Sequence, residues 1–190
     1  MAMKKVIVLP LYCVPSLAWF RQVEEGSVLK IVNYIDFPDA PEFRRIDFAG
    51  QQGRQQFILP LVSDSRKGDY KSVQLSYQTN WHHQLINALK TAYGKSPFYE
   101  YYDYRLEPIL KARPQYLYEL NLSLLKFVVQ ALKLDVEIEE TSEGDFEKPE
   151  FSDATAPYYQ VFADRNGFIG GLSVLDYLFN EGWDTFQVGK

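Results

Sequence analysis

Basic side chains gather at two places in the sequence where they could bind an anion. Arg44, Arg45 and Arg54 surround a glycine-bearing turn, and Lys95 directly precedes a predicted helix start. Guanidinium groups bind phosphate or carboxylate through paired hydrogen bonds, and the free amides of a helix N-terminus favour anions. Solvated loop charges and ordinary helix punctuation explain the same residues without a ligand. The segment around Lys95 is not a nucleotide-binding P-loop, because Leu89 stands where that motif requires glycine.

Few side chains in this sequence are candidates for proton transfer. The only two histidines, His82 and His83, are adjacent, and adjacent helical residues point about 100° apart, so they cannot chelate one metal side by side. A single histidine such as His83 could act as a general base near neutral pH, or it could belong to a polar helical turn at the surface. Asp176 could orient or deprotonate a hydroxyl group. Ser173, three residues earlier, offers Asp176 a purely structural role in a helix-capping pattern.

The sequence lacks the common motifs for metals and cofactors. Its single cysteine, Cys13, allows neither an intramolecular disulfide nor a thiolate zinc cage. It contains no G-x-S-x-G nucleophile elbow and no G-x-G-x-x-G dinucleotide fingerprint. We therefore expect no metal site and no cofactor.

Aromatic residues make up 16% of the chain and are densest in residues 98–104, which read FYEYYDY. If this segment is helical, its rings cannot all lie on one buried face, because four consecutive positions cover the full circle. Some of the tyrosines must meet solvent, another element or a ligand. Tyrosine rings beside carboxylates suit a sugar, which presents both apolar CH patches and hydroxyls. Packing of the helix against a sheet is the alternative.

The composition is that of a soluble globular chain. The chain has 190 residues, of which 46% are hydrophobic and 24% charged, and its net charge is −5. These values exclude an intrinsically disordered protein, and the negative charge argues against non-specific binding of nucleic acid. Nine of the 25 acidic residues but only one of the 20 basic residues lie between positions 135 and 153, so the rest of the chain is mildly basic. We interpret residues 135–153 as a solvated acidic loop, with a lid or metal-binding segment as the alternative.

The order of the predicted elements indicates an α/β or α+β fold. We expect one domain over residues 1–190, in which a mixed sheet from the N-terminal half is packed by helices from the middle and the C-terminus. Strands are predicted at residues 6–9, 28–35, 43–48, 57–62 and 72–77, the third and fourth as a pair. Helices are predicted from Pro15 or Ser16 to 25, over 81–93, from Ser96-Pro97, onward from about 108 to about 134, and from Ser173 to about 182.

The N-terminus imitates a secretory signal, with Lys4-Lys5 before an apolar run that reaches Phe20. Pro10 and Pro15 interrupt this run, no A-x-A-like step follows it, and it is shorter than the ~20 apolar residues that span a bilayer. We expect a cytoplasmic protein without membrane insertion.

Several segments, taken in order along the chain, resemble the WbqC-like protein family. They are residues 43–45 with Ala49-Gly50, Asn80-Trp81, residues 92–98 (AYGKSPF), residues 159–162 (YQVF) and residues 172–182 (LSVLDYLFNEG). The resemblance implies a role connected with bacterial surface polysaccharide such as O-antigen.

Two departures from the family pattern concern chemistry. Leu85-Ile86 stands where members tend to carry a His-aromatic step, and Gly170-Gly171 stands where they carry Pro-Asn. If the missing histidine is a catalytic base in the family, this chain is inactive or uses His82 or His83 instead.

Residue chemistry and resemblance together suggest a transferase of surface-polysaccharide biosynthesis that acts on a nucleotide-linked or lipid-linked sugar. A small anionic or sugar ligand would be its partner, with Arg45 and Lys95 at the anionic group and Tyr93, Tyr102 and Gln160 at the sugar or acceptor. Asp176 and His83 are the catalytic candidates. The alternative is a non-enzymatic ligand-binding or scaffold protein of a polysaccharide assembly complex, which the absence of a recognisable nucleophile–base pair favours.

Overall fold

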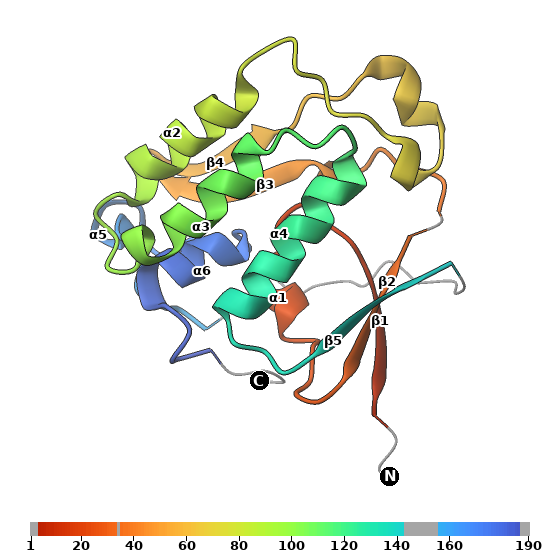
Figure 1. The fold of residues 1–190 in the computed structure, drawn as a ribbon. Helices are drawn as coiled ribbons and strands as arrows, with labels where there is room; N and C mark the ends of the chain where they lie inside the picture. Colours follow the sequence, from red (N-terminus) through yellow and green to blue (C-terminus); the bar gives the residue numbers. More distant parts are fainter. Residues whose placement is uncertain (1–3, 34, 143–155, 187–190) are drawn as a thin grey trace.

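The computed structural model describes residues 4–33, 35–142 and 156–186 and shows a mixed α/β fold, as predicted. A three-stranded parallel sheet has the order β1-β2-β5, and a two-stranded antiparallel sheet is formed by β3 and β4. The strands are β1 (Val6–Pro10), β2 (Val28–Val32), β3 (Arg45–Gly50), β4 (Gly53–Ile58) and β5 (Glu137–Thr141). The α-helices are α1 (Leu17–Phe20), α2 (Trp81–Tyr93), α3 (Tyr99–Lys111), α4 (Leu117–Ala131), α5 (Ala163–Asn166) and α6 (Val174–Glu181). Figure 1 shows the parallel sheet at the lower right and the β3–β4 hairpin on the far side of α2 and α3.

The central strand of the parallel sheet is β2, whose Leu29 and Ile31 are fully buried. Its apolar residues on either side of Lys30 are all buried, as expected for the central strand of a covered sheet. The edge strand β5 comes from the acidic stretch, and its Glu139 lies 3.9 Å from Lys30 while its Glu140 lies 2.8 Å from Lys71. The prediction of a loop from residue 135 onward is therefore wrong for 137–141, because lysines on neighbouring elements neutralise these glutamates. Residues 143–153 of that stretch lie outside the described residues.

The β3–β4 hairpin confirms the predicted pairing of two strands around Gly50 and Gly53, but its second strand runs over Gly53–Ile58 and not over 57–62. Gly50 pairs with Gly53 at its tip, and Gly53 adopts a φ of 104°, a left-handed conformation that glycine reaches without strain. Alternate β3 residues, Ile46 and Phe48, are buried. β3 contacts both α2 and α6, so this hairpin packs against helices from two distant parts of the sequence.

Helices α2, α3 and α4 form a helical layer that supplies much of the core. In α2, the predicted helical spacing places Trp81, Leu85, Leu89 and Tyr93 in the buried face. The helix start predicted at about residue 108 is wrong, because α3 continues through Pro108 to Lys111 and α4 begins at Leu117. None of the described helices is both long and apolar enough to cross a bilayer.

Two further local predictions differ from the structure. Residues 73–77 form no strand, because no neighbouring segment pairs with them over more than one residue. Gln74 forms a single bridge with Tyr116, and Leu75 forms one with Leu61. The helix predicted from Ser96 begins at Tyr99, because the hydroxyl of Ser96 donates to Asn180 Oδ1 (3.1 Å) and does not cap.

The helix predicted over residues 16–25 is likewise shorter, and α1 has only four residues. Its residues Leu17, Trp19 and Phe20 are nevertheless buried, so the apolar pattern marks a core segment.

Candidate functional site

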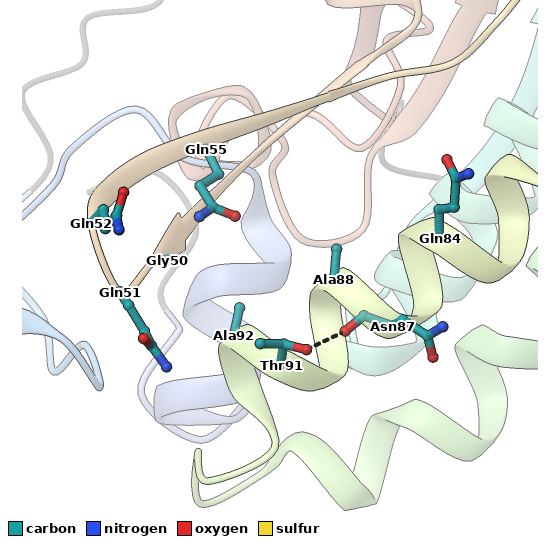
Figure 2. A pocket seen from close by; sticks show the side chains of 9 residues that line it. All are labelled: Gly50, Gln51, Gln52, Gln55, Gln84, Asn87, Ala88, Thr91 and Ala92. Carbon is teal, nitrogen blue, oxygen red and sulfur yellow. Dashed lines mark hydrogen bonds between the residues drawn. The ribbon is translucent and has the colours of Figure 1, made fainter.

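A cleft of about 610 Å³ opens between the tip of the hairpin and the middle of α2 (Figure 2). The hairpin contributes the wall formed by Gly50, Gln51, Gln52 and Gln55, and α2 contributes Gln84, Asn87, Ala88, Thr91 and Ala92. The α2 residues follow three- and four-residue steps, which place them on one face of the helix. The volume lies within the ~300–1,000 Å³ range of ligand-binding pockets.

The lining of the cleft is polar but uncharged. It carries five carboxamides, from Gln51, Gln52, Gln55, Gln84 and Asn87, and no Asp, Glu, Lys, Arg or His. Within the part of the chain that the structure describes, these five carboxamides make no hydrogen bond. The hydroxyl of Thr91 donates to the carbonyl of Asn87 (2.8 Å). The cleft therefore presents free donors and acceptors without a net charge.

The absence of a side chain at Gly50 leaves room for the side chain of Gln55 at the tip of the hairpin. A Cβ atom added to this glycine would lie 2.5 Å from Cδ and from Nε2 of Gln55, closer than side-chain atoms approach each other. The side chain of Gln55 thus lies across Gly50, as Figure 2 shows. Glycine at this position lets Gln55 contribute to the cleft.

A buried hydrogen-bond network centred on Asp176 lies behind this cleft. Its carboxylate is fully buried in α6 and accepts three hydrogen bonds, from the hydroxyls of Tyr93 (2.7 Å) and Tyr158 (2.6 Å) and from Nε2 of Gln160 (2.8 Å). Burial raises the pKa of Asp176, and the hydrogen bonds from Tyr158, Tyr93 and Gln160 oppose this rise. The carboxylate therefore joins α6 to the end of α2 and to the segment that contains Tyr158 and Gln160.

The network holds both walls of the cleft. The hydroxyl of Tyr93, at the end of α2, also accepts a hydrogen bond from the backbone N–H of Ala49 (2.9 Å), next to Gly50. The carboxamide of Asn166 donates to the carbonyl of Gly50 (3.0 Å). Residues of the C-terminal segment therefore fix the position of the hairpin tip relative to α2.

The capping pattern expected at the start of α6 does not form. Ser173 occupies the N-cap position of α6 as predicted, but its hydroxyl makes no hydrogen bond with the described residues. Its backbone N–H donates to the carbonyl of Asp47 and not to Asp176. The carboxylate of Asp176 points into the network, because the short aspartate side chain finds three donors there.

The arginines predicted to bind an anion already have acidic or carbonyl partners. Nε of Arg45 lies 2.8 Å from Asp47, and Nη1 of Arg54 lies 3.8 Å from the same carboxylate. Nη2 of Arg54 donates to the carbonyl of Gly170 (2.5 Å). Asp47 therefore competes with any added anion at this place.

The structure brings three of the seven predicted site residues together, namely Tyr93, Gln160 and Asp176. The other four are Arg45, Lys95, Tyr102 and His83, which neither bond to this network nor line the cleft. Their predicted roles stay predictions.

The surroundings of three of these residues differ. Lys95 is exposed after the end of α2, whereas Tyr102 is fully buried in α3, and burial raises its pKa to about 12. His83 is exposed on α2 and contributes, after Lys111 and Lys90, to the lowered pKa of Glu107. No group of three or more potential metal ligands occurs in residues 4–33, 35–142 and 156–186.

Comparison with known proteins gives one result for this chain. The model of the WbqC-like protein family matches residues 10–153, which is about three quarters of the chain. The matched range contains both walls of the cleft, whereas Gln160 and Asp176 lie beyond it. No curated protein and no solved structure matches the chain. The extent of the family match shows that the chain belongs to the WbqC-like protein family.

Proposed function

We propose that this protein binds a small-molecule ligand of bacterial surface-polysaccharide biosynthesis in the cleft between the hairpin and α2. Its family is associated with polysaccharide-related genes. The observation that carries the proposal is the set of five carboxamides, which line one cleft without bonding to the described protein. Exposed polar groups that converge on a concave surface are the usual sign of a binding site.

A ligand-binding role is favoured over the transferase role for a chemical reason. Enzymes commonly accelerate acyl or glycosyl transfer with a general base or a nucleophile within hydrogen-bond reach of the reacting atom. The residues found to line the cleft include no carboxylate, imidazole or thiol. Asp176, the sequence-predicted catalytic candidate, is enclosed behind the cleft wall with its hydrogen bonds already made. The protein therefore presents or holds its ligand within an assembly.

Obstruction of the cleft tests this proposal. Thr91→Trp adds a large side chain at an exposed helical position that faces the cleft, and Lys126→Trp makes the matched change on the exposed face of α4. Both variants are compared with the wild type by thermal shift and calorimetry against nucleotide sugars, neutral saccharides, acyl-CoA and amino acids. A ligand at 100 times its dissociation constant stabilises the fold by ~2.7 kcal/mol.

We expect a ligand to stabilise the wild type and Lys126→Trp but not Thr91→Trp. Equal binding by all three proteins, or no binding by the wild type, contradicts the proposal. A transferred product that forms with the wild type and is lost in Thr91→Trp would assign the transferase role instead.

A further inference from the structure

The charged groups nearest to the cleft in sequence do not line it. On the hairpin, Arg45 and Arg54 face Asp47, and Arg54 also bonds to the carbonyl of Gly170. On α2, neither Lys90 nor His83 lines the cleft, and both contribute, after Lys111, to the lowered pKa of Glu107 on α3. A phosphate in the cleft would therefore lose its water shell without gaining a cationic partner, which is unfavourable.

The carboxamides match a polyol better than they match an ion. A carboxamide has two N–H donors and one carbonyl acceptor, and a sugar hydroxyl likewise both donates and accepts. Each of the five carboxamides can therefore turn either end toward a hydroxyl or an acetamido group. An anion would use only their donors and leave the acceptors facing its charge.

Small residues line the cleft between the carboxamides. Ala88 and Ala92 lie on the α2 side, and Gly50 lies opposite them at the end of β3 (Figure 2). Ala92 and Gly50 are buried, so the base of the cleft carries only a methyl group and a glycine and presents no polar side chain. The CH face of a pyranose ring can rest on such a surface while its hydroxyls reach the amides at the rim.

We infer that the cleft binds an uncharged carbohydrate unit, with hydroxyl or acetamido groups held by the carboxamides, and leaves any phosphate of the ligand outside. This inference rests on the proposed function and names the chemical class of its ligand. Gln84 is the most informative residue, because it is exposed on α2 and its exchange alters the cleft without altering the core.

The test uses charge substitutions in the full chain. Wild type, Gln84→Glu and Gln84→Lys are titrated by NMR with methyl glycosides of neutral hexoses, 6-deoxyhexoses and N-acetylhexosamines, and with uridine diphosphate, at low and high salt. Gln22→Glu and Gln22→Lys are the controls, since Gln22 is an exposed glutamine outside the cleft. Side-chain amide signals of the cleft residues report where a compound binds.

We expect at least one methyl glycoside to bind in the cleft with the same affinity at both salt concentrations, because screening acts on charges only. Both Gln84 variants should weaken it by a similar factor of about two to ten, the effect of one lost hydrogen bond. The inference is overturned if uridine diphosphate binds in the cleft more tightly in Gln84→Lys and less tightly in Gln84→Glu, or if no glycoside binds there. When a charged compound occupies the cleft and Thr91→Trp excludes it, the proposed function stands and only the carbohydrate assignment fails. When nothing binds there, both fail.

Discussion

The cleft and the buried network behind it use similar polar side chains in opposite ways. Gln160 and Gln84 are both glutamines, but Gln160 is buried and bonds to Asp176 and to both backbone groups of Ile169, whereas the carboxamide of Gln84 bonds to no described residue. Buried polar groups that are fully paired stabilise a fold, and exposed polar groups without partners are available to a ligand. Residue type alone therefore does not separate structural from binding positions in this protein.

The largest effect should follow from removal of the network's acceptor. Asp176→Ala leaves the hydroxyls of Tyr93 and Tyr158 and the amide of Gln160 without their buried partner. Each unpaired buried donor costs ~1–3 kcal/mol, so we expect the free energy of unfolding to fall by about 3 kcal/mol or more. Urea denaturation measures this change. A loss below about 1 kcal/mol would show that the network contributes little to the stability of the fold.

A smaller loss is expected from Tyr93→Phe, which removes the hydroxyl that joins Asp176 to the N–H of Ala49. The loss should be about 1.5–3 kcal/mol, the value of a hydrogen bond to a charged group. Tyr102→Phe is the matched control, because Tyr102 is equally buried but its hydroxyl has no partner among the described residues. Equal losses in the two variants would show that packing, and not the hydrogen bonds, is responsible.

The pH dependence of stability should carry the signature of Asp176. Burial raises its folded pKa above the usual value of 3.8, so the folded chain keeps this proton to higher pH than the unfolded chain does. The contribution of this carboxyl group to the free energy of unfolding is greatest below its pKa in the unfolded chain. It declines as the pH rises through its pKa in the folded protein. Denaturation of wild type and Asp176→Asn over that range should therefore show the wild-type advantage shrinking with rising pH. An advantage that grows with pH would mean that the three hydrogen bonds outweigh burial.

Gly50→Ala should affect the cleft more than the fold. Its Cβ would meet the far end of the flexible Gln55 side chain, which can move away at little cost. We expect a stability loss below about 1 kcal/mol, at the low end of the range for point mutations, and a weaker ligand affinity because Gln55 leaves the cleft. In a Gln55→Ala background the same change should no longer affect binding. A persistent effect there would indicate that the glycine backbone itself matters.

The smallest effect on stability is expected at Gln84. Gln84→Ala removes an exposed carboxamide from a helical position and should alter the free energy of unfolding by no more than about 0.5 kcal/mol. Thermal denaturation checks this value, and alanine's higher helix propensity favours a slight gain. A substantial loss would show that this residue serves the fold.

The elements around the cleft were predictable because their signals are local. The apolar residues of α2 recur at helical spacing from Trp81 to Tyr93, and two glycines mark the tip of the hairpin. The failed strand at residues 73–77 shows the limit of this approach. Val73 and Leu75 are buried at alternate positions, as in a strand, but a strand also needs a neighbour of the same length, which no local pattern reports.

The cleft itself was not predictable from the sequence, since its walls come from residues 50–55 and 84–92 and consist of residue types that are common on any surface. Sequence reasoning named Tyr93 and Gln160 as ligand-binding candidates and Asp176 as a catalytic candidate, and the structure joins the three in one hydrogen-bond network. Nothing in the sequence reveals that all three are buried, and their predicted roles toward a ligand stay predictions. The run of glutamines at the hairpin tip, Gln51-Gln52 and Gln55, was the one signal available.

The most direct test of the central claim compares carboxamide signals from the two regions in one NMR titration. With a binding methyl glycoside, the side-chain amide resonances of Gln55, Gln84 and Asn87 should shift with a common dissociation constant, while that of Gln160 stays in place. Shifts that centre on Gln160, or on Arg45 and Lys95, with the cleft amides unchanged, would contradict the account.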